Sequence, residues 1–398
     1  MRSRYADRSG SLGGTRLDGS FHARRSVGPA HAPSVASLPR PRGEQRPDLR
    51  VLASPAFHHR LANPYTWLLY THMVAAGGVV VKDYSHRRLL RRRYDLVHVH
   101  WPEGHLNDGN SVRALRRVVS ALGMLRWARS RGAKIVWTVH NLHSHERLYP
   151  TLERWFWRAF IPRLDGYISL SHSGQEAVLA RFPELRRIPG FVIPAGHYRD
   201  AYSLDLPKAA ARDKLAIDAR SNVVSFVGLV RRYKNVPQLI GSFRALADRA
   251  LTLLVAGEPK SDDVAADVRA AAGDDPRVRL HLGWIPNEQI LLYLAAADLV
   301  VLPFSEVLNS GSALLALSFD RPVLVPRMGS LTELQEMVGA GWVRTYQGEL
   351  TPACLASAIA WAVGTPRPPR PPLEALAWDR IAAATREAYA SVVTGVGR

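Results

Sequence analysis

The sequence NVVSFVGLVRRYKN (residues 222–235) contains the most informative loop of this chain. Its first part is a run of apolar and β-branched residues, which is typical of a buried strand. Gly228 ends the run and allows the backbone to approach a ligand closely. Arg231 and Lys234 follow, and they combine a bidentate donor with a point charge, both suited to a diphosphate. An ordinary solvated basic turn is the alternative, so the neighbouring segments must decide.

Apolar runs of the same kind recur on both sides of this segment, and helical patterns separate them. After residue 235 they are LTLLVAGE (251–258), VRLHLGWI (278–285), LVVLPFSE (299–306), RPVLVP (321–326) and GWVRTY (341–346). Before residue 222 they are LRVLASPA (49–56), VVVKDYS (79–85), YDLVHVHW (94–101), AKIVWTVH (133–140), GYISLS (166–171) and FVIPAG (191–196). Strands that alternate with helices predict an α/β fold with two Rossmann-like parallel sheets in tandem. Ligands bind such sheets beyond the carboxyl ends of the strands, so we expect the site in the cleft between two facing halves.

A polar, helix-breaking stretch at residues 202–207 marks the boundary between the halves. We therefore expect one domain at 49–203, a second at 204–372, and a C-terminal helix within 373–398 that packs back towards the first domain. The Pro-rich sequence GTPRPPRPP (364–372) is typical of a stiff connector. Residues 1–48 mix Arg, Ser, Gly and Pro without a periodic apolar pattern, which predicts a disordered basic tail.

The composition excludes several classes of protein. Apolar residues make up 47% of the 398 positions and charged residues 22%, so a large core can form and wholesale disorder is excluded. The single cysteine, Cys354, rules out an intramolecular disulfide framework and indicates a reducing compartment. No apolar run reaches the ~18 residues of a membrane span, and the N-terminus lacks the apolar core of a secretory signal. We expect a cytoplasmic protein that is at most attached to a membrane surface.

The net charge of +19 is concentrated in the first half of the chain. Residues 51–195 carry +12, whereas residues 196–398 carry +1. Such asymmetry indicates that the first half faces a polyanion, either an anionic lipid surface or nucleic acid. No nucleic-acid-binding motif accompanies the charge, so no nucleic-acid partner is expected. An arginine-rich genome that fills solvated faces with arginine is the alternative explanation.

Two segments of the basic half have the composition of an interfacial anchor on anionic lipid, which combines arginine with tryptophan. They are YSHRRLLRRRYD (84–95) and LERWFWRAFIPRL (152–164). The membrane surface expected from them consists of Arg87, Arg88, Arg91, Arg92, Arg93, Trp155 and Trp157. Alternatively, the aromatic cluster of the second segment belongs to the core.

A second loop of the later half carries polar residues at the start of a helix. In LPFSEVLNSGSALLALSFDRPVLVP (302–326), a strand ends at Pro303 and an apolar helix begins near Ser312. Asn309, Ser310 and Gly311 at the helix N-terminus offer free N–H groups and the positive end of the helix dipole, which suits a phosphate. An ordinary N-cap is the alternative, because Asn and Ser are preferred there. Both loops leave the same sheet edge, and this convergence favours a ligand site.

These loops, their order and their spacing resemble the nucleotide-binding domain of GT-B glycosyltransferases, particularly the group with sucrose synthases and phosphatidylinositol mannosyltransferases. That group has a Gly-Arg after a strand and a Lys six residues beyond the Gly, and Gly228 and Lys234 match this spacing. The segment 284–304 resembles the family's nucleobase loop and the helix and strand that follow it. GSLTEL (329–334) resembles its final donor-side turn, and DRPV (320–323) matches part of its Gly-x-Pro-Val. The donor-binding residues that the resemblance implies are Gly228, Arg231, Lys234, Glu306, Asn309, Ser310, Gly311 and Ser312.

The sequence departs from that pattern at the residues that hold the nucleotide. Leu229 replaces the arginine after the glycine, so Arg231 or Arg232 must substitute for it. Leu315 replaces the second of two glutamates, and Glu306 stands one position out of register with the first. The form LNSGSALLAL (308–317) is more similar to exopolysaccharide-assembling glycosyltransferases, including bacterial β-mannosyl- and glucuronosyltransferase types.

Histidines at two strand ends of the first half are candidates for the sugar-transfer end of the site. LVHVHWPE (96–103) places His98 and His100 on one face of a strand and Trp101 on the other. IVWTVHNLHSHE (135–146) likewise delivers His140 and a following asparagine at a strand end. In related GT-B enzymes a histidine at the corresponding strand end contacts the transferred sugar, and His140 matches that position.

We expect His140 and Glu103 to be catalytic, and His100, Asn141 and His145 to contact the acceptor or the sugar. An inverting transfer needs a base for the acceptor hydroxyl, for which Glu103 or His140 is the candidate. In a retaining transfer no such base is needed, and His140 would serve the sugar. A zinc site is an alternative use of these histidines, since His-x-His and nearby carboxylates are legitimate ligands. GT-B transfer does not ordinarily require a metal, so neither a metal nor a cofactor is expected.

The prediction is a metal-independent hexosyltransferase that moves a sugar from a GDP- or UDP-sugar to a lipid-linked or polysaccharide-precursor acceptor. It is expected to work at the inner face of the plasma membrane, with an anionic membrane surface as a partner. The second domain would bind the nucleotide sugar and the first the acceptor. A nucleotide-sugar epimerase of the same fold and a nonenzymatic polyanion-binding protein are the alternatives.

Overall fold

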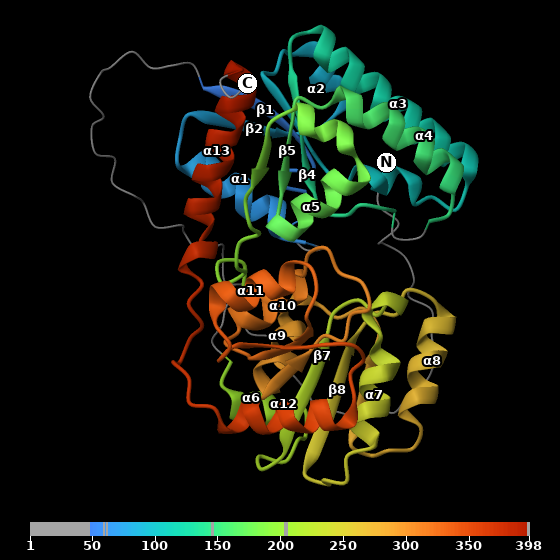
Figure 1. Ribbon diagram of the computed structural model, residues 1–398, viewed down its shortest axis with the longest axis vertical. Helices are drawn as coiled ribbons and strands as arrows, with labels where there is room; N and C mark the ends of the chain where they lie inside the picture. Colours follow the sequence, from blue (N-terminus) through green and yellow to red (C-terminus); the bar gives the residue numbers. More distant parts are fainter. Residues whose placement is uncertain (1–47, 59, 61–62, 145–146, 203–205, 396–398) are drawn as a thin grey trace, which may run out of the picture. The chain divides into compact units, whose positions relative to one another are not determined.

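The computed structural model describes residues 48–58, 60, 63–144, 147–202 and 206–395. The predicted tail at 1–48 therefore lies outside the described residues except for its last position, and so does His145. Residues 46–398 form one compact unit. Within it, two six-stranded sheets of parallel strands follow one another along the chain, so the predicted fold class is confirmed (Figure 1).

The first sheet has the strand order β2-β1-β3-β4-β5-β6. Its strands are β1 (Leu49–Ser54), β2 (Val79–Asp83), β3 (Leu96–His100), β4 (Lys134–Val139), β5 (Gly166–Ser169) and β6 (Gly190–Val192). The connecting helices are α1 (Tyr65–Ala75), α2 (His86–Arg91), α3 (Ser111–Ser130), α4 (Pro150–Phe160) and α5 (His172–Arg181). Every residue of β3 is buried, because a parallel sheet is covered on both faces.

The second sheet has the order β12-β11-β10-β7-β8-β9. Its strands are β7 (Asn222–Val227), β8 (Leu251–Gly257), β9 (Val278–Leu282), β10 (Leu299–Val301), β11 (Val323–Pro326) and β12 (Val343–Tyr346). The helices are α6 (Lys208–Lys214), α7 (Val236–Arg244), α8 (Asp262–Ala272), α9 (Asn287–Ala296), α10 (Gly311–Ser318), α11 (Ser330–Val338) and α12 (Pro352–Gly364). Strand β10 ends at Val301, two residues before the predicted end at Pro303. Proline has no N–H to donate to a ladder, which is why it does not extend the strand.

Each sheet has a point where the strand order reverses. In the second sheet this point lies between β7 and β10, which are neighbours in space although β8 and β9 separate them in sequence. Loops that leave the carboxyl ends of strands at such a point diverge and open a crevice for a ligand. The two loops singled out from the sequence, after β7 and after β10, flank this crevice.

The last helix, α13 (Trp378–Thr394), packs against α1 of the first half and contacts β4 (Figure 1). Trp378 and Tyr389 of α13 are buried, and the indole Nε1 of Trp378 donates to the carbonyl of His197 at 2.6 Å. A short 3₁₀ turn, Glu374–Leu376, precedes α13, so the helix begins later than residue 373. None of the described helices has the length and apolar character needed to cross a bilayer.

Candidate active site

The loop after β7 forms a cationic pocket around Gly228. A Cβ atom added to Gly228 would lie 3.3 Å from the Lys234 ammonium and 3.4 Å from the Ser312 hydroxyl, so these two groups converge on the glycine. Gly228 has a φ of 133°, a backbone conformation that favours glycine. Lys234 is buried over the rings of Phe226 and Phe304, and burial together with Arg231 lowers its pKa to about 8. A buried cation beside a second cation is a site for an anion.

The loop after β10 leads into α10 on the other side of this pocket. Ser310 is the N-cap of α10, and its hydroxyl accepts a hydrogen bond from the N–H of Ala313 at 3.2 Å. The amide of Asn309 donates to the backbone carbonyls of Val139 and His140, at 3.4 and 3.3 Å, so this loop touches the end of β4 in the first half. The position of the missing second glutamate, Leu315, is partly buried against the core.

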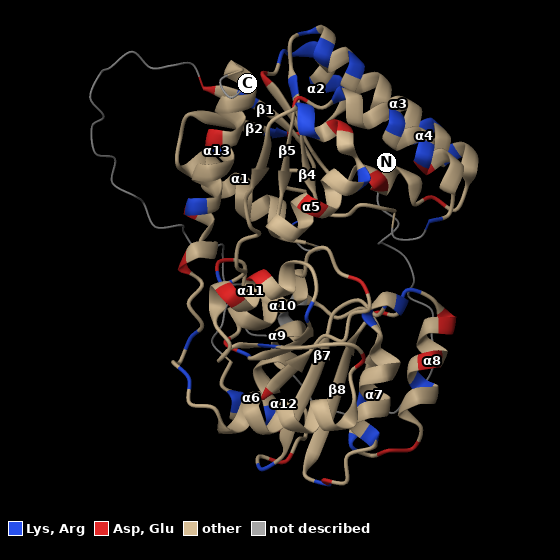
Figure 2. Cartoon of the chain, in the orientation of Figure 1, with Lys and Arg blue, Asp and Glu red and all other residues tan. Residues whose placement is uncertain are grey.

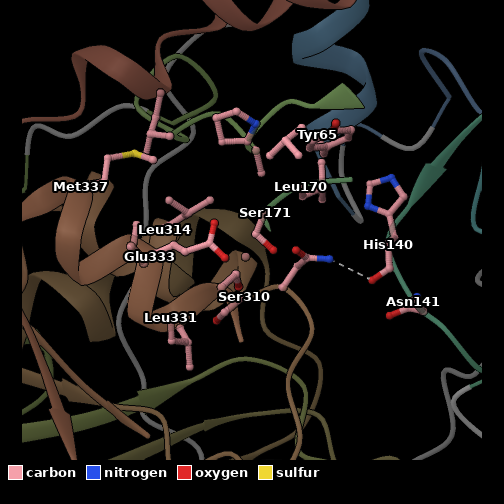
Figure 3. Close-up of a pocket in the computed structure, with 18 of the residues that line it drawn as sticks. Tyr65, His140, Asn141, Leu170, Ser171, Ser310, Leu314, Leu331, Glu333 and Met337 are labelled. Carbon is pink, nitrogen blue, oxygen red and sulfur yellow. Dashed lines mark hydrogen bonds between the residues drawn. The ribbon is translucent and has the colours of Figure 1, made fainter. Parts of the chain in front are cut away.

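Two cavities meet at these loops. The larger, of about 960 Å³, is lined by Arg231, Lys234, Lys260, Glu306 and Ser312, among others. The smaller, of about 360 Å³, is drawn in Figure 3, with His140 and Asn141 on one wall and Leu314, Leu331 and Met337 on the opposite wall. Five residues line both cavities: Asn141, Tyr233, Asn309, Ser310 and Gly311. A ligand in one cavity can therefore reach a ligand in the other.

His140 lies at the end of β4, on the wall of the smaller cavity. Its ring stacks on Trp101, with ring centroids 4.2 Å apart and an interplanar angle of 21°. The ring nitrogen Nε2 is 3.0 Å from Nδ1 of His100. Burial lowers the pKa of His140 to about 3, so its imidazole is neutral at physiological pH.

Glu103, expected to be catalytic, lies behind Asn141 and lines neither cavity. The 3₁₀ turn Pro102–Leu106 folds its side chain inward, and only 2% of it is exposed. Its Oε1 accepts a hydrogen bond from the Asn141 amide at 2.6 Å, while Oε2 is buried with no hydrogen-bond partner in the described part of the chain. Burial raises the pKa of Glu103 to about 7. Glu103 therefore reaches the site through Asn141.

Trp101 also differs from its expected position. The sequence pattern put it on the strand face opposite His98 and His100, but its φ of 46° breaks the alternation directly after β3. The indole turns to the smaller cavity, where it stacks on His140. His100 is buried in the sheet and lines neither cavity, so the expected contact with a substrate is replaced by a contact with His140.

The residues expected on a membrane surface separate into two groups. The five arginines of the α2 region and Trp155 are exposed, the latter by 46%. Trp157 is 3% exposed and packs among Trp137, Phe160 and Phe182, so it belongs to the core and not to a surface. The helix period explains the difference, because α4 turns residue 157 towards the sheet and residue 155 away from it.

Several residues of the site carry no motif in the sequence. Tyr65 and Tyr198 line the smaller cavity from α1 and from the segment after β6. Glu333 of α11 also lines it and accepts hydrogen bonds from the backbone N–H groups of His172 and Ser173, at 2.8 and 2.7 Å. The sequence marks this region only through GSLTEL (329–334), which predicts a donor-side turn and does not single out Glu333. Across the residues with described positions, no group of three or more His, Cys, Asp or Glu side chains could hold a metal ion.

Two parallel sheets with a cationic pocket at the switch point of the second are the arrangement of a GT-B glycosyltransferase. Residues 221–364 match the family described as "Glycosyl transferases group 1". The chain is 32% identical over 348 residues to the GDP-mannose:glycolipid 4-beta-D-mannosyltransferase of Xanthomonas campestris pv. campestris, covering 87% of this chain and 93% of that protein. The chain belongs to the group 1 glycosyl transferases and uses a nucleotide sugar as its donor.

Solved structures of low sequence identity share the fold. Sucrose-phosphate synthase from Thermosynechococcus elongatus superposes with a TM-score of 0.61 at 17% identity, over 87% of this chain and 100% of that one. Anabaena Alr3699/HepE in complex with UDP and glucose gives a TM-score of 0.56 at 17% identity, over 87% and 98% of the two chains. Family membership supports glycosyl transfer over the epimerase and the nonenzymatic alternatives.

Proposed function

We propose that this enzyme transfers mannose from GDP-mannose to the saccharide of a glycolipid. The Xanthomonas relative that carries this activity in its name aligns over nearly the whole of both chains. The observation that carries the proposal is the pair of cavities that meet at Asn141, Tyr233, Asn309, Ser310 and Gly311. A donor in one cavity and an acceptor in the other would meet at these residues.

The larger cavity suits the nucleoside diphosphate of the donor. Arg231 and Lys234 supply positive charge, and the N-terminus of α10 adds backbone N–H groups and the helix dipole. These groups stabilise the charge that develops on the leaving diphosphate, and no metal is invoked. Arg232, the other candidate for the missing arginine, pairs with Asp263 and with Asp267 of α8, so the role falls to Arg231.

The smaller cavity suits the acceptor. Its walls carry the aromatic rings of Tyr65, Trp101 and Tyr198, which offer flat apolar faces with polar edges, as a saccharide requires. Leu331 and Met337 line the far side and give the cavity an apolar end. A glycolipid presents both kinds of surface, which is why we assign it to this cavity.

The chemistry follows from the linkage named for the relative. GDP-mannose carries an α-linked mannose, so a β-mannosyl product requires inversion at the anomeric carbon. The acceptor oxygen attacks that carbon, the bond to the diphosphate oxygen breaks, and GDP leaves with the bonding electrons. A base must take the acceptor proton, and we assign this role to His140 because it lines the acceptor cavity. Glu103 is assigned to holding the Asn141 amide at the junction of the cavities.

Membrane attachment through the first half would bring the enzyme to such an acceptor. Figure 2 shows Lys and Arg gathered along α2, α3 and α4. The arginines of 87–93 are joined by exposed apolar side chains of α2 and α3, namely Leu90, Val112, Leu115 and Val119, each about half exposed. Cations beside exposed apolar groups match an anionic bilayer surface, and we assign this surface to the inner face of the plasma membrane.

A donor panel tests the proposal. Purified enzyme is given a lipid-linked saccharide with GDP-mannose, GDP-fucose, UDP-glucose or UDP-glucuronate, and release of the nucleoside diphosphate is measured. We expect acceptor-dependent release of GDP from GDP-mannose above all others. Preference for a UDP-sugar, or release that does not depend on the acceptor, would contradict the proposal.

A further inference from the structure

A chain of hydrogen-bonded side chains runs from His140 into the interior of the first half. Nε2 of His140 contacts Nδ1 of His100 at 3.0 Å, and Nε2 of His100 contacts the Tyr70 hydroxyl at 2.7 Å. The same hydroxyl contacts Nδ1 of His98 at 2.8 Å, and Nε2 of His98 contacts the Thr138 hydroxyl at 2.7 Å. Strands β3 and β4 and helix α1 supply these groups, and the Tyr389 hydroxyl of α13 contacts the same Nδ1 of His98 that Tyr70 contacts.

The side chains of this hydrogen-bonded series are buried, and its histidines are uncharged. Tyr70, His98 and Thr138 have no exposed surface, and His100 is 3% exposed. Burial lowers the pKa of His98 to about 3 and that of His100 well below its ordinary value. Each histidine therefore carries one hydrogen, so each has one donor and one acceptor nitrogen.

The direction of the chain decides which nitrogen of His140 holds the hydrogen. In one direction His140 Nε2–H donates to His100, His100 donates to Tyr70, Tyr70 donates to His98, and His98 donates to Thr138. The lone pair of His140 then lies on Nδ1, the nitrogen that is not engaged with His100. If every hydrogen bond ran in the opposite direction, Nδ1 of His140 would carry the hydrogen and would have no lone pair to take the proton of the acceptor hydroxyl.

We propose that His100 and Tyr70 are positioning residues that hold His140 in the Nε2–H tautomer, with the Nδ1 lone pair available to the acceptor hydroxyl. The proposal rests on the proposed role of His140 as the base. A carboxylate fixes the tautomer of a catalytic histidine in the same way in serine hydrolases. Here Nδ1 of the neutral His100 accepts the hydrogen bond from Nε2–H of His140, and the buried Tyr70 phenol holds His100 at its other nitrogen. When Nδ1 takes the acceptor proton, the Nε2–H still donates to His100, so the imidazolium keeps its partner.

The tautomer can be read directly by nitrogen NMR of protein labelled with ¹⁵N-histidine, because protonated and unprotonated ring nitrogens have distinct shifts. His140→Gln identifies the His140 signals by their loss. We expect an unprotonated Nδ1 and a protonated Nε2 in the parent, and a mixture of both tautomers in Tyr70→Phe. A parent spectrum with hydrogen on Nδ1 would overturn the proposal, whether or not Tyr70→Phe folds.

Steady-state kinetics of Tyr70→Phe give a second test of the proposal. Tyr70→Phe should lower kcat about tenfold while KM for the donor changes less than about twofold, because a tautomer defect acts on the base and not on nucleotide binding. Tyr167→Phe is the matched control, because it removes the hydroxyl of another buried tyrosine of the first half. That hydroxyl accepts a hydrogen bond from Gln175 and takes no part in the hydrogen-bonded series that ends at His140, so the variant should keep the parent kcat. A kcat for Tyr70→Phe equal to that of the control would overturn the proposal. The spectrum needs no substrate, so an error in the assigned donor leaves it interpretable.

Discussion

The side-chain amide of Asn309, on the loop that leads into α10, donates to the backbone carbonyl of His140 at 3.3 Å. This contact joins the loop beside the cationic pocket of the second half to the end of β4, where His140 lies. The loop proposed to bind the diphosphate and the residue proposed as the base are therefore in direct contact.

The cationic pocket should bind the diphosphate and not the nucleoside. Lys234→Ala and Arg231→Ala should each weaken GDP binding by about 1.5–3 kcal/mol, because each removes a charge-assisted contact to a phosphate. Calorimetric titration with GDP and with guanosine measures the difference. An equal loss of affinity for guanosine would show that the loop only supports the fold.

His140 should be needed for transfer and not for donor binding. His140→Ala should lower kcat at least about 100-fold, the usual effect of removing a general base. The variant should keep the parent melting temperature and GDP affinity, because the cationic pocket lies on the other half of the chain. Unfolding of the variant would place His140 in the core, and full activity would remove it from the reaction.

Glu103 should make stability fall as pH rises. Burial raises its pKa from 4.5 to about 7, so the folded state binds more protons than the unfolded state between these values. The contribution of Glu103 to the free energy of unfolding should therefore decrease from pH 4.5 to 7 and stay reduced above, and comparison with Glu103→Gln separates it from the opposite contribution of the buried histidines His98 and His140. Glu103→Gln keeps an acceptor for Asn141 and should be more stable than the parent at pH 8 by about 1–2 kcal/mol. Denaturant unfolding at pH 5 and pH 8 measures this, and a variant less stable than the parent at pH 8 would contradict it.

The basic surface should be a membrane surface. Neutralising Arg87, Arg88, Arg91, Arg92 and Arg93 should nearly abolish sedimentation with vesicles of anionic lipid, because each arginine near such a surface contributes on the order of 1 kcal/mol. Added salt should release the parent, since surface charges are screened over ~10 Å at 0.1 M. Neutralising the exposed cations Lys214, Arg220, Arg249 and Arg269 of the second half is the control and should have little effect. Equal binding of the parent to neutral vesicles would contradict the assignment, and tighter binding to RNA would favour the polyanion-binding alternative.

The fold could be predicted because its signals are local. Apolar runs such as LRVLAS (49–54) form strands of 3–7 residues. The helical patterns lie between these runs in sequence, and the alternation implies parallel sheets. The order of the strands could not be predicted, because it depends on contacts between β7 and β10 that are far apart in the chain.

Only part of the candidate site could be predicted. His140 follows β4 directly, and Lys234 and Asn309 lie in the loops after β7 and β10. The rule that ligands bind at the carboxyl ends of strands, together with the resemblance to GT-B enzymes, selected these three residues. Trp101 was misplaced because a left-handed residue breaks the strand alternation. Trp157 was assigned to a surface because composition alone does not tell which side of α4 faces the sheet. The His100–Tyr70 contact joins a strand to a helix about 30 residues earlier, and no motif marks it.

The anomeric configuration of the product shows whether transfer from GDP-mannose inverts the anomeric carbon, as a base at His140 requires. The enzyme is incubated with GDP-mannose labelled with ¹³C at the anomeric carbon and with a lipid-linked saccharide, and the one-bond C–H coupling of the new linkage is measured by NMR. We expect a single new β-mannosyl linkage that forms with the parent and disappears with His140→Ala. An α-linked product would show retention and contradict the assignment of His140 as the base, and the absence of any mannosyl product would contradict the proposed donor.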